Sequence, residues 1–162
     1  MYTEYQPSHL LVPYIDNYWE FKGNPDYGMR IHILPDGCTD FIFTLGEVAN
    51  AVEEGSLMMQ PYRSYFVGPM TKYSELVTYT ESIHMFGVRF LPCGLSCFTN
   101  LPLHEFVNSR VSTNEMKAVF DDTFIEKLGE QKHVTDRIRV VEEYLLAYLA
   151  RHYKPDDSHV AM

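Results

Sequence analysis

IHMFGVRFL, residues 83–91, is the stretch that decides the fold of this chain. A short run rich in aromatic and β-branched residues is typical of a β-strand, and Pro92-Cys93-Gly94 ends it with turn-forming residues. The same character recurs in Tyr18 to Phe21, Met29 to Leu34, Thr39 to Leu45, Tyr65 to Val67 and Leu76 to Tyr79. Because these runs are short and no long helix separates them, we expect antiparallel pairing in a sandwich or barrel.

After Gly94 the residue pattern predicts helices instead of strands. Ser112 and Glu115 have the spacing of a capping box, which predicts a helix over residues 112–120. The clearest helix spans residues 134–152, where apolar residues recur at spacings of three and four. This apolar stripe consists of Val134, Ile138, Val141, Leu145, Leu146 and Leu149. The polar residues assigned to the opposite face are Arg137, Arg139, Glu142, Glu143 and Arg151. The stripe packs either on the chain's own β-structure or on a twin helix of a second subunit.

These patterns predict an α+β chain in three regions. Residues 1–100 form the β-barrel, and residues 101–153 form a helical region with a candidate dimerisation helix. Residues 154–162, KPDDSHVAM, are polar and contain a proline, which is typical of a linker or tail.

The charge of the chain excludes some partners. Thirteen Lys and Arg against twenty-two Asp and Glu give a net charge of −9. Proteins that grip nucleic acid carry a basic surface, so these residues are not expected to hold DNA or an anionic membrane. No apolar run approaches the about 20 residues of a membrane span, and the amino terminus lacks a signal-peptide pattern, so we expect a cytoplasmic protein.

The three cysteines, Cys38, Cys93 and Cys97, are an odd number, which argues against a disulfide framework. The Cys93/Cys97 spacing by itself is a weak zinc signal, so three reduced thiols are expected.

No catalytic motif appears in the sequence. It contains no GxSxG elbow, no glycine-rich phosphate loop and no HExxH. His32 and His84 are the only histidines on predicted strands, and no HxH pair could place two imidazoles side by side. We therefore expect no catalytic residue, no metal and no cofactor.

A small-molecule pocket is the remaining possibility for a site. Its candidate ligand-binding residues are Trp19, His32, Tyr65, Tyr73 and His84. His84 has the strand parity of Phe86, Val88 and Phe90, so it faces the barrel interior if they do, whereas Arg89 points outward or toward the helices. Each candidate also has a purely structural interpretation: Trp19 as a core anchor, the tyrosines as rim residues and the histidines as satisfied core or rim groups.

The order of several segments resembles the amino-terminal domain of AraC-type transcription regulators. The segments are Leu11 to Trp19, Ile33 to Phe43, Phe66 to Thr71, Phe86 to Leu95 and Leu101 to Phe106. The resemblance runs from about residue 7 to about residue 150. It implies a cupin-like or jelly-roll barrel followed by helices, with motif residues that are mostly architectural, such as Gly87.

The resemblance implies a sensor that binds an unknown small effector and forms a homodimer. DNA would be held only by a carboxy-terminal helix-turn-helix domain that this chain lacks. Two alternatives stay open: a cupin-type isomerase or dioxygenase with a metal at His32 and His84, and a scaffold that dimerises without a ligand.

Overall fold

The computed structural model describes residues 2–23, 30–33, 37–45, 49–51, 59–71, 74–78, 83–113, 119–120 and 123–152. The strands among these described residues are β1 (Tyr2–Tyr5), β2 (Ile15–Gly23), β3 (Arg30–Ile33), β4 (Thr39–Thr44), β5 (Ala49–Ala51), β6 (Ser64–Val67), β7 (Ser74–Thr78), β8 (Ile83–Phe90) and β9 (Arg110–Ser112). Its helices are the short 3₁₀ turns η1 (Leu95–Cys97) and η2 (Leu103–Phe106), then α1 (Phe124–Glu130) and α2 (Val134–His152). The predicted helix over residues 134–152 is therefore confirmed.

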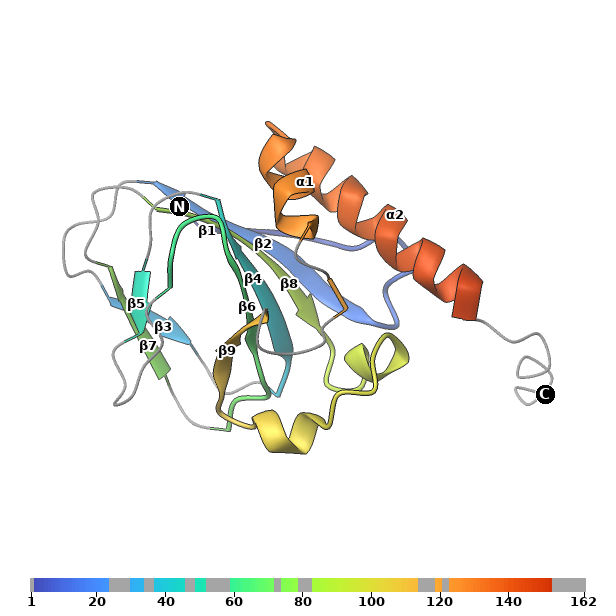
Figure 1. Ribbon diagram of the computed structural model, residues 1–162, viewed down its shortest axis with the longest axis horizontal. Helices are drawn as coiled ribbons and strands as arrows, with labels where there is room; N and C mark the ends of the chain where they lie inside the picture. Colours follow the sequence, from blue (N-terminus) through green and yellow to red (C-terminus); the bar gives the residue numbers. More distant parts are fainter. Residues whose placement is uncertain are drawn as a thin grey trace.

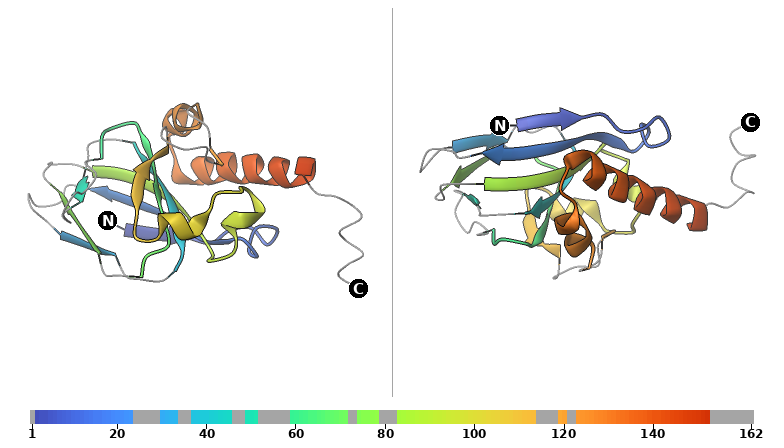
Figure 2. Two further views of the ribbon diagram at one scale, coloured as in Figure 1. Left: turned by 60° about the horizontal axis from the view of Figure 1, so that its bottom comes forward. Right: turned by 90° about the horizontal axis from the view of Figure 1, so that it is seen from above.

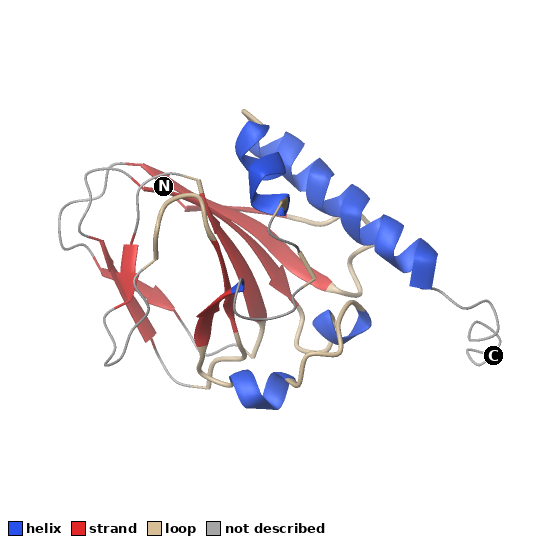
Figure 3. Ribbon diagram, viewed as in Figure 1, coloured by secondary structure: helices blue, strands red, loops and turns tan. Residues whose placement is uncertain are grey.

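The strands form two antiparallel sheets. The large sheet has the order β1-β2-β8-β4-β6-β9, and the small sheet has the order β3-β7-β5. The small sheet lies on the side of the large sheet away from α1 and α2 (Figures 1 and 3). The α+β class, an antiparallel β-structure followed by carboxy-terminal helices, is confirmed.

β9 ends at Ser112, which pairs with Tyr65 of β6. The strand lies beyond the predicted end of the β-region at residue 100. The helix predicted over residues 112–120 falls mostly on residues 114–118, which lie outside the described residues.

The central strands of the large sheet are buried on both faces. In β8, and in β2 from Tyr18 on, even-numbered residues such as Tyr18 and Phe86 face the helices, whereas odd-numbered residues such as Trp19 and Met85 face the other side. All six residues of β4 and all four of β6 are buried, as expected for strands covered on both sides.

The apolar stripe of α2 packs on the chain's own sheet. Val141 and Leu145 are fully buried, and the other four stripe residues contact the same core. Figure 2 shows α2 running along the large sheet. This contact uses the face that a twin helix would have needed, so the intramolecular alternative is the correct one for the stripe.

None of the three cysteines forms a disulfide with another described cysteine. Cys38 is buried and 8% exposed, whereas Cys93 and Cys97 are exposed. Within the described ranges, neither α2 nor any other helix combines the length and the apolar character needed to cross a membrane. The predicted tail at residues 154–162 lies outside the described residues.

Candidate functional site

Trp19 lies in a polar cluster on the face of the large sheet away from the helices. Its indole Nε1 donates a hydrogen bond to Oδ1 of Asp40 at 3.0 Å. Arg89 Nε donates to both carboxylate oxygens of Asp40, at 3.2 and 3.3 Å. Of the two directions expected for Arg89, outward or toward the helices, the second is wrong, because Phe86, Val88 and Phe90 occupy the helix-covered face.

The Trp19 ring is also packed closely. It stacks with Tyr2 at a centroid distance of 5.9 Å, and a Cβ on Gly87 would lie 1.9 Å from its Cε2. The Tyr2 hydroxyl donates to Glu4, and burial together with Glu4 raises the pKa of Tyr2. At 6% exposure, Trp19 is a core residue whose indole already contacts protein groups.

The other predicted pocket residues that the structure describes do not form one site with Trp19. Tyr65 is on the same face, but its hydroxyl accepts a hydrogen bond from Gln60 N at 2.6 Å. His84 lies on the opposite, helix-covered face, and His32 belongs to β3 of the small sheet, opposite Glu75. Tyr73 lies outside the described residues.

A second cluster connects the sheet to α2. His84 Nε2 is 2.8 Å from Oε2 of Glu20, and Arg137 Nη1 donates to the same oxygen at 3.2 Å. Burial lowers the pKa of His84; Glu20 opposes this shift and Arg137 adds to it. Because a guanidinium is already bound to this carboxylate, the cluster is a poor place for a metal cation.

Arg137 also holds the carboxy-terminal end of α1. Its guanidinium donates to the carbonyl oxygens of Leu128 at 3.4 Å and Gln131 at 2.8 Å. Helix ends leave such carbonyls without partners, so one buried side chain joins α1, α2 and the sheet. Sequence reasoning placed Arg137 on the solvent face, yet it is only 6% exposed. The feature of the sequence that indicates its burial is its position four residues before the buried Val141, which places both on one face of the helix.

Glu142 makes a second polar link between α2 and the rest of the chain. Its Oε2 accepts hydrogen bonds from Ser8 N at 2.9 Å and from the Tyr18 hydroxyl at 3.0 Å. Burial and the Glu142 carboxylate raise the pKa of Tyr18, so the phenol stays a donor. Glu142 was also assigned to the solvent face, and the tertiary contact with the turn at Ser8 was invisible in the sequence.

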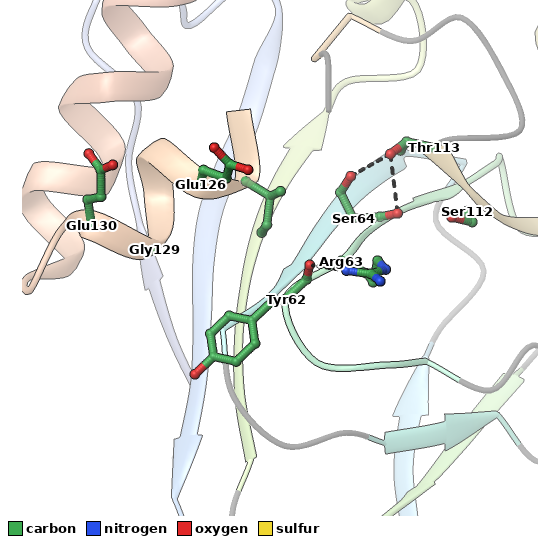
Figure 4. Close-up of a pocket in the computed structure, with 9 residues that line it drawn as sticks. Tyr62, Arg63, Ser64, Ser112, Thr113, Glu126, Gly129 and Glu130 are labelled. Carbon is green, nitrogen blue, oxygen red and sulfur yellow. Dashed lines mark hydrogen bonds between the residues drawn. The ribbon is translucent and has the colours of Figure 1, made fainter. Parts of the chain in front are cut away.

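A groove of about 740 Å³ lies between α1 and the start of β6 (Figure 4). It is lined by Tyr62, Arg63, Ser64, Ser112, Thr113, Ile125, Glu126, Gly129 and Glu130. Its volume is within the range of small-molecule sites. Trp19, Tyr65 and His84 are not among its lining residues, and its walls come from segments about 50 residues apart in the sequence.

Among the described residues, no three His, Cys, Asp or Glu side chains come together as a metal site requires. The arrangement thus offers a buried Trp-Asp-Arg cluster, a polar connection to α2 and an open polar groove beside α1.

Comparison with known proteins identifies a family and finds distant similarity to solved structures. The family described as "Domain of unknown function (DUF6597)" matches residues 3–112. No curated protein is similar to the chain. The crystal structure of the Cupin_2 domain of an XRE-family transcriptional regulator from Enterobacter cloacae is similar, with a TM-score of 0.46 and 10% identity. That similarity covers 57% of this chain and 96% of the Cupin_2 chain.

Proposed function

Since the chain belongs to the DUF6597 family, which names no activity, we propose from its own features that it is the effector-sensing and dimerisation module of an AraC-type transcription regulator. In this proposal the antiparallel β-structure binds a small effector, and the helices transmit the response to a second subunit. The DNA-binding helix-turn-helix units belong to another part of the full-length protein.

The observation that carries the proposal is the way α2 is attached. Besides its apolar stripe, α2 is held by Arg137 through Glu20 and by Glu142 through Tyr18 and Ser8. Polar contacts of this kind have defined geometries, so they favour discrete helix positions over continuous sliding. An effector with different affinities for two such positions would shift their populations.

Contacts between the segments that carry the AraC resemblance give further support. A Cβ on Gly68 would lie 1.9 Å from the carbonyl oxygen of Phe106, and one on Gly94 would lie 2.1 Å from that of Tyr14. Each glycine belongs to one of the resembling segments and touches another. Such interlocking is the architectural role that the resemblance implies.

The metal-enzyme alternative finds no support at its two histidines. His84 and His32 belong to different sheets, and Glu20 and Arg137 already occupy the surroundings of His84. Stoichiometric iron, zinc or nickel in the purified protein would revive that alternative.

The oligomeric state tests the proposal. The exposed apolar residues Leu10 and Val12 are 56% and 52% exposed, and their turn is hydrogen-bonded to α2 through Ser8 and Glu142. We expect light scattering at tens of micromolar to give twice the chain mass of 18.9 kDa. We also expect Leu10→Ser/Val12→Ser to shift the protein toward the monomer.

Val107→Ser is the matched control, because Val107 is also exposed but lies in a different turn, after η2. A wild-type monomer at this concentration would contradict the dimerisation half of the proposal. Equal dimerisation by both variants would place the interface away from Leu10 and Val12.

A further inference from the structure

We propose that the groove beside α1 binds a small organic cation that carries N–H donors, an amine of roughly sugar or aromatic-amine size. The inference deepens the proposed function, on which it rests for the claim that the ligand acts as an effector.

The Ser64–Thr113 pair in the groove offers a ligand only hydrogen-bond acceptors. Ser64 and Thr113 are 7% and 6% exposed, and their hydroxyls are hydrogen-bonded to each other. Thr113 Oγ1 also donates its single proton to the Ser64 carbonyl oxygen at 3.3 Å, so the Ser64 hydroxyl must donate to Thr113. Both protons are used within the pair, and the hydroxyls can offer a ligand only lone pairs.

The α1 wall adds two carboxylates. Glu126 and Glu130 are one helical turn apart on α1 (Figure 4); both line the groove and both are exposed. Side chains at this spacing are neighbours on a helix surface, so an ammonium group can contact both. Gly129 between them leaves the wall open, since a Cβ there would meet nothing within 4 Å.

An aromatic ring stands at the mouth of the groove. Tyr62 is 60% exposed and has a φ of 56°. Hydrogen bonds from Tyr62 N to the Thr44 carbonyl and from Arg63 N to Thr44 Oγ1, both 2.9 Å, hold its backbone. The ring face attracts cations.

Arg63 is the one cationic side chain among the described residues that line the groove. It points away from α1 (Figure 4) and donates to the Tyr62 carbonyl. The α1 side of the groove is thus left with acceptors, carboxylates and a ring. This combination recognises a positively charged donor and disfavours anions.

The groove is also connected to α2. Its wall α1 has seven residues, and Arg137 of α2 holds the carboxy-terminal carbonyls of this short helix. A ligand that moves α1 therefore acts on the residue that joins α2 to the sheet.

The test is a binding measurement on the full chain with two matched pairs of probes: tyramine with 4-ethylphenol, and glucosamine with glucose. Calorimetry and thermal shift are expected to detect at least one amine and neither neutral partner. Tetramethylammonium, a cation without N–H donors, is expected to bind more weakly than the amines.

Glu126→Gln/Glu130→Gln is expected to weaken amine binding by about tenfold or more, the effect of losing one charge-assisted hydrogen bond. The control Glu105→Gln/Glu143→Gln removes the same charge from exposed positions outside the groove and is expected to keep the wild-type affinity. The inference fails if neither amine binds, if a neutral partner binds equally well, or if the groove variant keeps full affinity.

Light scattering on the same samples separates the two proposals. A dimer that binds no amine overturns this inference and leaves the dimerisation proposal standing. A monomer that binds an amine in the groove overturns the dimerisation proposal and supports this inference.

Discussion

A substitution at Gly87 gives the most direct test of the close packing of the large sheet. The indole of Trp19 occupies the space where any other residue would place its Cβ. Trp19 in turn is fixed by its hydrogen bond to Asp40 and its stacking with Tyr2. The ring cannot move aside without breaking a buried polar contact.

Gly87→Ala is therefore expected to lower the free energy of unfolding by about 2–3 kcal/mol, as overpacking of a filled core does. Urea denaturation followed by Trp19 fluorescence measures it. Gly129→Ala is the control, since its Cβ meets nothing and alanine favours the helix by up to about 1 kcal/mol. Equal losses in the two variants would contradict the packing argument.

His84 gives the stability a pH dependence at the residue scale. Burial lowers its pKa below the ordinary 6.5, while Glu20, Arg137 and Lys22 surround it. The unfolded chain therefore takes up a proton more readily than the folded protein as the pH falls. The contribution of neutral His84 to the free energy of unfolding is fully present above the pKa of His84 in the unfolded chain. It is lost as the pH falls from that value through the lower pKa of the folded protein.

We expect the drop in the free energy of unfolding between about pH 7.5 and about pH 5.5 to be smaller in His84→Gln than in the wild type. Glutamine keeps a donor for Glu20 and does not titrate. His104→Gln, at an exposed histidine, is expected to behave as the wild type. A drop in His84→Gln as steep as in the wild type would show that His84 does not carry this dependence.

At the scale of elements, Arg137 is the contact that keeps α1 and α2 together on the sheet. It is buried, and its three acceptors are Glu20, Leu128 and Gln131. Removing it leaves a carboxylate and two helix-end carbonyls without this donor, and such losses are costly away from water.

Arg137→Met is expected to lower the free energy of unfolding by about 3 kcal/mol, and Arg137→Lys by less, because an ammonium cannot reproduce the planar fork. Hydrogen exchange should show faster opening of α1 in both variants. The control Arg139→Met removes a side chain that is 65% exposed and is expected to change stability by less than about 1 kcal/mol. Unchanged protection of α1 in Arg137→Met would refute the linking role.

The whole molecule is too acidic to bind DNA through these residues. With a net charge of −9, the chain lacks the cations that neutralise phosphates. A gel-shift assay with duplex DNA and the 162-residue chain at moderate salt should show no retarded band. Salt-sensitive retardation by this chain alone would contradict the division into sensing and DNA-binding parts.

The residues alone determined the local elements that do not depend on distant partners. The six longest aromatic or β-branched runs became strands, and the spacing in residues 134–152 gave the bounds of α2. Hydrophobic periodicity is a local property, so it can be recognised from the sequence alone. The strands β1, β5 and β9 were missed; β5 and β9 together contain a single β-branched residue, Val111, so their composition does not indicate a strand.

Only the tertiary structure decided which face of the sheet each side chain occupies and what meets it there. Strand parity placed His84 with Phe86, but parity is symmetric and does not say which face the helices cover. Arg137 and Glu142 looked like solvent-facing charges until Glu20, Tyr18 and Ser8 were brought to them. The groove exists because α1 packs beside β6 and β9, a contact between remote segments that no local pattern records.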